Sequence, residues 1–298
     1  MPTFPPPVFI ITCMRSYSSL VCGMLGQHPQ LYSLPEINLA TAERISAMLG
    51  LFLTIRPASL HGLWRAVAQL EFGAQTDDTV AEARKWIDAR RNWTTAELFY
   101  HIAARVGPRA IVEKSPTSVF LPKHLDRLLA TFPDARFLHL TRHPRPTCKS
   151  IHALIAATDA KKGTSRADQS DPEKMWTRMN GNAFAFLDQL PAGQGMRIAG
   201  EDLLTDPDRY FRQICGWLEI RDDDAALEAM KHPELSPYAC LGPDSARFGN
   251  DPNYLTHPEF NQRPIAPSKL DGPLDWTENG AAGFSQATRA LANAMGYT

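Results

Sequence analysis

The feature that most constrains this chain is an apolar strand that runs into a short polar turn and then into a helix. Residues 8–11, VFII, are apolar and mostly β-branched, which is typical of a strand buried on both faces. The turn contains Arg15 and three serines, and the helical stretch after it closes at Gly26 and Pro29. Free backbone N–H groups and the positive end of a helix dipole make such a turn a good anion site. Taken alone, the pattern fits an anion cradle and a purely structural turn equally well, since the phosphate-loop pattern G-x-x-x-x-G-K-[ST] is missing.

Composition narrows the class of protein and of partner. The 298 residues are 44% hydrophobic and show no clear linker, so we expect a single domain over residues 1–298. The 31 basic and 32 acidic residues leave a net charge of −1, which argues against a nucleic-acid partner. The first residues, MPTFPPP, lack the basic and apolar regions of a signal peptide, so none is expected, and no run nears the roughly 18 apolar residues of a membrane span. Its five cysteines form no C-x-x-C pair, which favours the reducing cytoplasm.

Strand and helix patterns alternate along the chain. Residues 30–107 are mostly helical in pattern, and the part from about 37 to 107 is expected to form a helical layer inserted between the first and second strands. Further strands are predicted at 110–112, 136–141 and 196–199, and helices at 60–72, 80–91, 94–106, 122–131, 146–157, 175–190, 207–218 and 283–295. This alternation predicts an α/β fold with a P-loop-like central parallel sheet flanked by helices.

Polar residues follow three of the predicted strands. Ser16, Lys114 and Arg142 each stand at a separate junction between a strand and the next loop. Because ligands of parallel sheets bind at the carboxyl ends of the strands, this coincidence favours the anion site over a structural turn. Two stretches lack apolar periodicity: residues 158–172 predict an exposed loop, and residues 231–268, with seven prolines, predict an irregular segment.

Four short motifs follow one another along the chain. They are Met14-Arg15-Ser16-Tyr17-Ser18-Ser19 with His28-Pro29 after it, Glu113-Lys114-Ser115-Pro116, Arg142-His143-Pro144-Arg145 with Ser150, and Gly200-Glu201-Asp202-Leu203 leading to Asp206-Pro207. In this order they resemble the sulfotransferases that use 3′-phosphoadenosine 5′-phosphosulfate (PAPS), most clearly over residues 8–218. The resemblance implies an enzyme that moves a sulfonate from PAPS to a hydroxyl of a small-molecule or carrier-bound acceptor and leaves 3′-phosphoadenosine 5′-phosphate (PAP).

The chain departs from the family pattern at two places. Tyr17 stands where the first motif commonly has Gly, so the loop is expected to differ in shape or to carry a ring near the nucleotide. Ala199 and Gly200 replace the usual Arg-Tyr that precedes Glu201, so any role of those two side chains is absent.

The resemblance also assigns roles to residues. The implied nucleotide-binding residues are Arg15, Ser16, Tyr17, Ser18, Ser19, Arg142 and Ser150. Arg15 is assigned to the 5′-phosphate and to charge on the leaving oxygen, and Arg142 with Ser150 to the 3′-phosphate. Each has a structural alternative: a surface arginine, a helix-capping serine, or a helix serine bonded to its own turn. Positioning and electrostatics carry most of such a transfer, and the sulfonate is less charged than a phosphoryl group, so no metal is required.

The acceptor hydroxyl needs a base, and two residues are candidates. Residues 249–253 with His257, and Pro35-Glu36, are similar to the sulfotransferases of bacterial polyketide and other secondary-metabolite pathways. Glu36 equally fits a capping box that Ser33 opens, with Pro35 inside the helix start. His257 beside Pro258 equally fits a turn.

Lys114 is the remaining catalytic candidate, either neutralising the sulfonate or acceptor region or forming a salt bridge to an acid such as Glu113. The helical layer and segment 231–268 are expected to shape the acceptor side.

Two rival functions stay open at this point. One is a kinase-like phosphotransferase, against which the missing Gly-Lys-[ST] argues. The other is a non-catalytic protein that binds PAP or another nucleotide.

Overall fold

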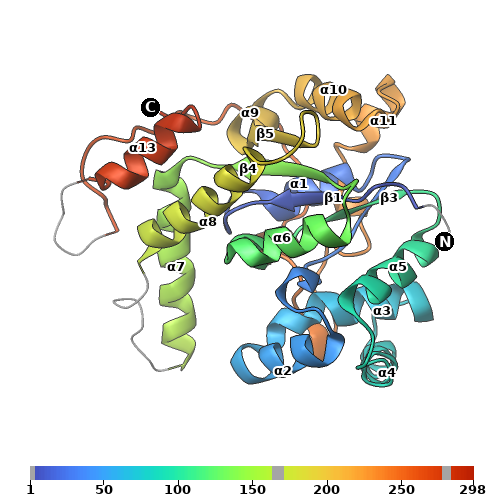
Figure 1. Ribbon diagram of the computed structural model, residues 1–298. Coiled ribbons are helices and arrows are strands. Elements are labelled where there is room, and N and C mark those ends of the chain that lie inside the picture. The colour runs from blue at the N-terminus through green and yellow to red at the C-terminus, as the bar shows by residue number, and fades with distance from the viewer. Residues whose placement is uncertain (1–3, 163–170, 277–282) are drawn as a thin grey trace.

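A parallel sheet forms the centre of the computed structural model, which describes residues 4–162, 171–276 and 283–298 (Figure 1). Within these residues, five strands follow the order β2-β3-β1-β4-β5, and each neighbouring pair is parallel. The strands are β1 (Val8–Ile11), β2 (Leu31–Ser33), β3 (Ala110–Glu113), β4 (Arg136–Thr141) and β5 (Gly195–Ala199). The α/β fold with a parallel central sheet flanked by helices is therefore confirmed, and β1, β3, β4 and β5 lie where the sequence predicts strands.

Both faces of the sheet are buried, which explains the continuous apolar run of β1. Phe9 and Ile11 pack into the core on one side, whereas Val8 and Ile10 pack into the core on the other. All four side chains are at most 2% exposed. The first core is completed by α5 (Thr95–Val106), α6 (Pro122–Thr131) and α8 (Pro172–Leu187), and the second by α1 (Ser18–Leu25), α9 (Gly200–Thr205) and α10 (Pro207–Leu218).

The helical layer consists of α2 (Ile45–Ile55), α3 (His61–Phe72), α4 (Asp77–Asp88) and α5, and it lies below the sheet in the view of Figure 1. Capping boxes start α4 and α5, because Thr76 and Thr94 each exchange hydrogen bonds with the third residue of the helix. The layer follows β2, so the prediction that it lies between the first and second strands is wrong. With only three residues, β2 is too short to show a strand periodicity.

Two local predictions are also wrong. Ser33 ends β2 and Glu36 lies in the non-helical segment before the short helix η1 (Leu39–Thr41), so the two residues form no capping box. Helix α7 (Pro144–Lys162) continues through residues 158–162, where the sequence predicts a loop. The rest of that predicted loop, residues 163–170, lies outside the described residues.

Segment 231–268 contains three short helices joined by irregular chain. They are η5 (Pro233–Leu235), η6 (Asp244–Ala246) and α12 (Pro252–Thr256). The remaining helices of the described residues are η2 (Pro57–Leu60), η3 (Pro116–Val119), α11 (Asp224–Ala229) and α13 (Gln286–Ala294).

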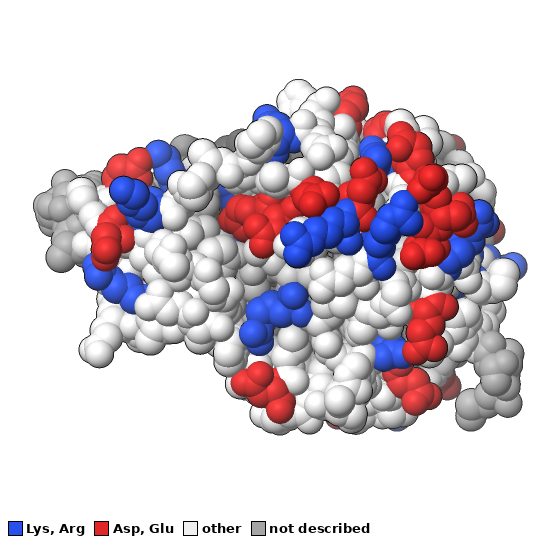
Figure 2. Space-filling model, turned by 90° about the horizontal axis from the view of Figure 1, so that it is seen from above, with Lys and Arg blue, Asp and Glu red and all other residues white. Residues whose placement is uncertain are grey.

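Charged side chains of both signs are mixed on the face that α9, α10 and α11 cover (Figure 2). Ion pairs on this face join Arg212 to Asp224, Lys231 to Asp208 and Arg221 to Asp223. The face therefore offers no continuous basic surface to a polyanion. Among the described residues, no helix has both the length and the apolar character needed to cross a membrane.

Candidate functional site

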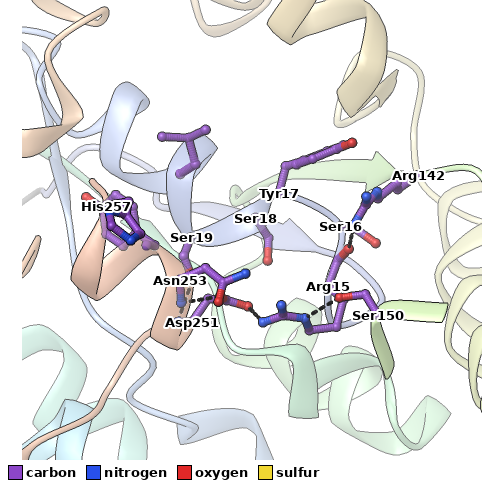
Figure 3. A pocket seen from close by; sticks show the side chains of 12 residues that line it. Arg15, Ser16, Tyr17, Ser18, Ser19, Arg142, Ser150, Asp251, Asn253 and His257 are labelled. Carbon is purple, nitrogen blue, oxygen red and sulfur yellow. Dashed lines mark hydrogen bonds and ion pairs between the residues drawn. The ribbon is translucent and has the colours of Figure 1, made fainter. Parts of the chain in front are cut away.

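A cavity of about 310 Å³ opens beyond the carboxyl ends of β1 and β4. It brings together residues that the sequence singles out: Arg15, Ser16, Tyr17, Ser18, Ser19, Arg142, Ser150 and His257 (Figure 3). Two other predicted site residues, Glu36 and Lys114, do not line it. Asp251 and Asn253, from the stretch 249–253, and Tyr254 also line it, although none of the three is assigned a role from the sequence.

The loop between β1 and α1 takes a backbone course that normally favours glycine. Arg15 and Tyr17 have φ values of 65° and 63°, in the left-handed region that residues with side chains rarely adopt. Tyr17 is the N-cap residue of α1, and within the described residues no side chain caps this helix. At position 17 the loop thus adopts a backbone conformation that favours glycine, although the residue there is Tyr17. The aromatic ring of Tyr17 lies in the cavity wall.

Arg15 lies in the middle of the cavity wall and is held from two sides (Figure 3). Its Nε donates to Ser150 Oγ at 2.9 Å, and its Nη1 is paired with Oδ2 of Asp251. The Arg15 and Asp251 side chains are 13% and 25% exposed, so solvent screens this ion pair only weakly. The resemblance assigns Arg15 and Ser150 to opposite phosphates of the nucleotide, whereas here the two side chains are in direct contact.

Arg142 is joined to the same loop by stacking and by a hydrogen bond. Its guanidinium carbon lies 4.2 Å from the centre of the Tyr17 ring, and its Nη1 donates to the carbonyl oxygen of Arg15 at 2.7 Å. Burial raises the pKa of the Tyr17 hydroxyl, so the ring stays neutral. The Arg142 Nε is buried and has no hydrogen-bond partner in the described part of the chain. A fixed guanidinium with an unused N–H is suited to bind an anion.

The two departures from the family pattern meet in space. A Cβ atom added at Gly200 would lie 2.9 Å from Cδ2 of Tyr17 and 3.2 Å from the carbonyl oxygen of Thr141. The Tyr17 ring therefore occupies the space that a side chain at position 200 would need. Tyr17 and Gly200 therefore form a sterically matched pair.

We expect Gly200→Ala to lower the free energy of unfolding by about 1–3 kcal/mol, because the added methyl group overpacks against the Tyr17 ring. Removing the ring with Tyr17→Gly in the same chain should recover part of this loss, so the two changes should be non-additive. Urea denaturation of the wild type, both single variants and the double variant measures the coupling. Effects that add within about 0.5 kcal/mol would show that the two positions are independent.

Serine hydroxyls near the start of α1 form a second set of donors. Ser16 Oγ is buried, and no group in the described residues bonds it. Ser19 Oγ accepts from Lys114 Nζ at 2.9 Å and from the Asp251 N–H at 3.0 Å, so its own proton remains to be donated. Buried hydroxyls without a partner are rare in proteins, and an anionic ligand in the cavity would supply one. The residues present therefore fit a phosphate or phosphosulfate group.

Lys114 reaches the cavity through Ser19. Lys114 is 1% exposed, and its ammonium group both bonds Ser19 and pairs with Oε1 of Glu36. Its acidic partner is thus Glu36 rather than Glu113. The Glu113 carboxylate accepts from Ser115 Oγ, and burial raises its pKa to about 7. Glu36 is therefore committed to an ion pair outside the cavity lining.

His257 lies at the end of the cavity away from Arg142 (Figure 3). It follows α12, and its N–H donates to the carbonyl oxygen of Asn253 at 2.9 Å. Its side chain is exposed, and its imidazole has no hydrogen-bond partner among the described residues. Helix α12 begins after Asp251, whose Oδ1 accepts from the Asn253 N–H, with Pro252 at the first helical position. This Asp-Pro pair is a helix-start signal in the sequence that could have drawn attention to Asp251.

Comparison with known proteins gives the family. Residues 6–224 match the model of the sulfotransferase family. The sulfotransferase domain from the Synechococcus PCC 7002 olefin synthase has a TM-score of 0.75 and 25% sequence identity, with 100% of this chain and 98% of that chain covered. The sulfotransferase domain from the curacin biosynthetic pathway has a TM-score of 0.73 and 21% identity, with 99% of each chain covered. A search of the curated proteins finds no match.

The polar loop that follows the central strand lies at the carboxyl edge of the parallel sheet, where ligands of such sheets bind. The family model covers most of the chain, and the chain belongs to the sulfotransferase family. It is therefore an enzyme that transfers a sulfonate group. The kinase-like and non-catalytic alternatives are not favoured.

Proposed function

We propose that this enzyme takes the sulfonate from PAPS and passes it to a hydroxyl of a small-molecule or carrier-bound acceptor. The observation that carries the proposal is the order of groups along the cavity. Arg142 lies at one end, Arg15 in the middle and His257 at the other end (Figure 3). A nucleotide with a 3′-phosphate, a 5′-phosphosulfate and then an acceptor hydroxyl presents two anions followed by a proton to be removed, in the same order.

The residues at the nucleotide end have distinct roles in this proposal. PAPS supplies a sulfonate that is already activated on its 5′-phosphate. Arg142 and Ser150 hold the 3′-phosphate, and Tyr17 fixes the orientation of the Arg142 guanidinium. Arg15 binds the 5′-phosphate with its planar fork and stabilises charge on the leaving oxygen.

Three serines and one lysine complete the proposed nucleotide site. Ser16, Ser18 and Ser19 donate to the 5′-phosphate together with the N–H groups of the first turn of α1. Lys114 acts indirectly, because its ammonium group orients the Ser19 hydroxyl. No metal is required in this scheme, because the protein cations supply the positive charge.

His257 is the base that we propose for the acceptor hydroxyl. It lines the cavity and has a free imidazole within the described residues, whereas Glu36 is paired with Lys114 outside the lining. A base must lie within hydrogen-bond reach of the proton it removes, so position favours His257 over Glu36. The transfer itself is in line, from the bridging oxygen of PAPS to the acceptor oxygen.

The class of acceptor is inferred from the neighbours and from the cavity wall. The two similar sulfotransferase domains come from the curacin biosynthetic pathway and from an olefin synthase, and this supports an acceptor of secondary metabolism. Segment 231–268 contributes Asp251, Asn253, Tyr254 and His257 to the wall and so shapes the acceptor end.

The five cysteines are free thiols, which supports our placement of the enzyme in the cytoplasm.

Calorimetry and a transfer assay test the proposal. The wild-type protein should bind PAP more tightly than it binds ATP with magnesium. It should also move labelled sulfonate from PAPS to at least one member of a panel of free and carrier-bound hydroxyl acceptors. A preference for ATP with magnesium would overturn the proposed donor. Tight PAP binding without transfer to any acceptor would contradict the proposed acceptor class.

A further inference from the structure

The middle of the cavity contains a carboxylate that does not suit an anionic ligand. Among the cavity-lining residues of the described chain, Asp251 alone is acidic. Its Oδ2 is paired with Arg15 Nη1, the cation at the middle of the cavity. Because both side chains are more than two-thirds buried, the attraction is much stronger than in an exposed surface pair.

The position of this carboxylate is fixed by the surrounding backbone. The second oxygen, Oδ1, accepts from the Asn253 N–H at 2.9 Å and so caps α12. The backbone N–H of Asp251 donates to Ser19 Oγ at 3.0 Å. One residue thus links Arg15, the start of α1 and the helix that leads to His257. Asp251 is a built part of the cavity and not a loose surface side chain.

We propose that Asp251 is an internal counter-ion. It pairs with Arg15 in the nucleotide-free enzyme, and an anionic ligand replaces it as the partner of Arg15. This inference rests on the proposed function for the identity of the ligand. The Arg15 guanidinium has five N–H donors, of which Nε bonds Ser150 and Nη1 pairs with Asp251. A phosphate that binds Nη1 therefore competes with the Asp251 carboxylate for that group. The competition weakens the binding of PAPS and of PAP alike, and it helps PAP to leave after each turnover.

Asp251 keeps its own position when Arg15 changes partner. When Arg15 turns to the ligand, Asp251 keeps its bond to Asn253 and its place at the start of α12. The anion at the 5′-phosphate position and the capping carboxylate then face each other across Arg15. The exchange therefore changes the partner of Arg15 and leaves the start of α12 in place.

Asp251→Asn tests the proposal with little other change. Asparagine has nearly the same size and is an equally good N-cap residue, so α12 is retained and only the charge is lost. We expect PAP to bind about ten-fold more tightly, the effect of one charged hydrogen bond, because the single amide oxygen caps α12 and the NH2 group that then faces Arg15 cannot accept from it. Inorganic pyrophosphate, measured at constant ionic strength by calorimetry, should show a gain of the same sign. Inhibition by PAP in the transfer assay should strengthen in proportion.

Asp223→Asn is the matched control. Asp223 also caps a short helix, α11, and pairs with an arginine, Arg221, but it does not line the cavity. Its replacement should leave PAP and pyrophosphate affinities at the wild-type level. Asp251→Ser, a smaller neutral N-cap residue, is the second variant, and thermal melts establish that each protein is folded.

The outcomes separate this inference from the proposed function. If Asp251→Asn and Asp251→Ser bind pyrophosphate no better than wild type, Asp251 is not a competing counter-ion. If the wild type fails to bind PAP, the proposed donor is wrong, and the pyrophosphate measurements still decide the role of Asp251. If Asp223→Asn gains as much as Asp251→Asn, the gain reflects net charge and the inference falls.

Discussion

Replacing His257 with Gln is expected to slow sulfonate transfer by about 10²- to 10⁴-fold, which is the usual contribution of a positioned base. PAP affinity should stay close to that of the wild type, because His257 lies at the end of the cavity away from Arg142. The backbone N–H of His257 still closes α12, so the fold of the segment should be kept. Single-turnover rates at saturating PAPS, together with PAP titrations, separate the loss of chemistry from a loss of binding.

Glu36→Gln is the control for this experiment. The change leaves Lys114 buried without its partner charge, so its main cost is expected in the stability of the protein. Rates are therefore compared per folded protein, after urea denaturation of each variant. On our proposal, folded Glu36→Gln keeps most of its transfer rate. An active His257→Gln protein beside an inactive, folded Glu36→Gln protein would assign the base to Glu36.

The longer helices and strands could be predicted because their apolar residues follow the pattern typical of a helix or of a buried strand. The bounds of α6, β4 and α10 agree with the pattern of the sequence. Strand β2 could not be predicted, since its three residues show no alternation and pair with β3 only in the folded sheet. The end of α7 was missed for a different reason. Residues 158–162 have no apolar periodicity, yet Asp-Ala-Lys-Lys contains good helix formers that extend a helix already started.

The functional site also has residues whose placement the sequence predicts and residues whose placement it does not. Arg15 and Arg142 could be predicted as neighbours because they follow strands whose carboxyl ends meet at one edge of the sheet. The partners of the predicted cations could not. Asp251 lies 236 residues from Arg15 in the chain, and it arrives on an irregular segment whose path no pattern reveals. Glu36 was expected to act as a base or a cap, and its pairing with Lys114 depends on how the β2–η1 connection crosses the end of β3.

The second large effect is expected from Arg142→Ala, because this change should remove the binding of the 3′-phosphate. Loss of a charge-assisted hydrogen bond costs about 1.5–3 kcal/mol, which corresponds to roughly 10- to 150-fold in affinity. Arg142→Ala should weaken PAP by about that factor. It should weaken adenosine 5′-monophosphate much less, because this nucleotide differs from PAP only in lacking the 3′-phosphate. The measurement is the ratio of the two dissociation constants by calorimetry.

The ratio is needed because Arg142 also supports the loop between β1 and α1. Its guanidinium bonds the carbonyl oxygen of Arg15 and stacks on Tyr17, so alanine is expected to loosen the loop and to reduce the affinity for both nucleotides. Tyr17→Leu removes the stacking and keeps the charge, so it should weaken PAP more than adenosine 5′-monophosphate, but by a smaller ratio than Arg142→Ala does. Arg15→Ala should also weaken both, since both nucleotides carry a 5′-phosphate. The 3′-phosphate contact is then the part of the Arg142→Ala effect that only PAP feels. Equal weakening of PAP and adenosine 5′-monophosphate by Arg142→Ala would assign the 3′-phosphate to another cation.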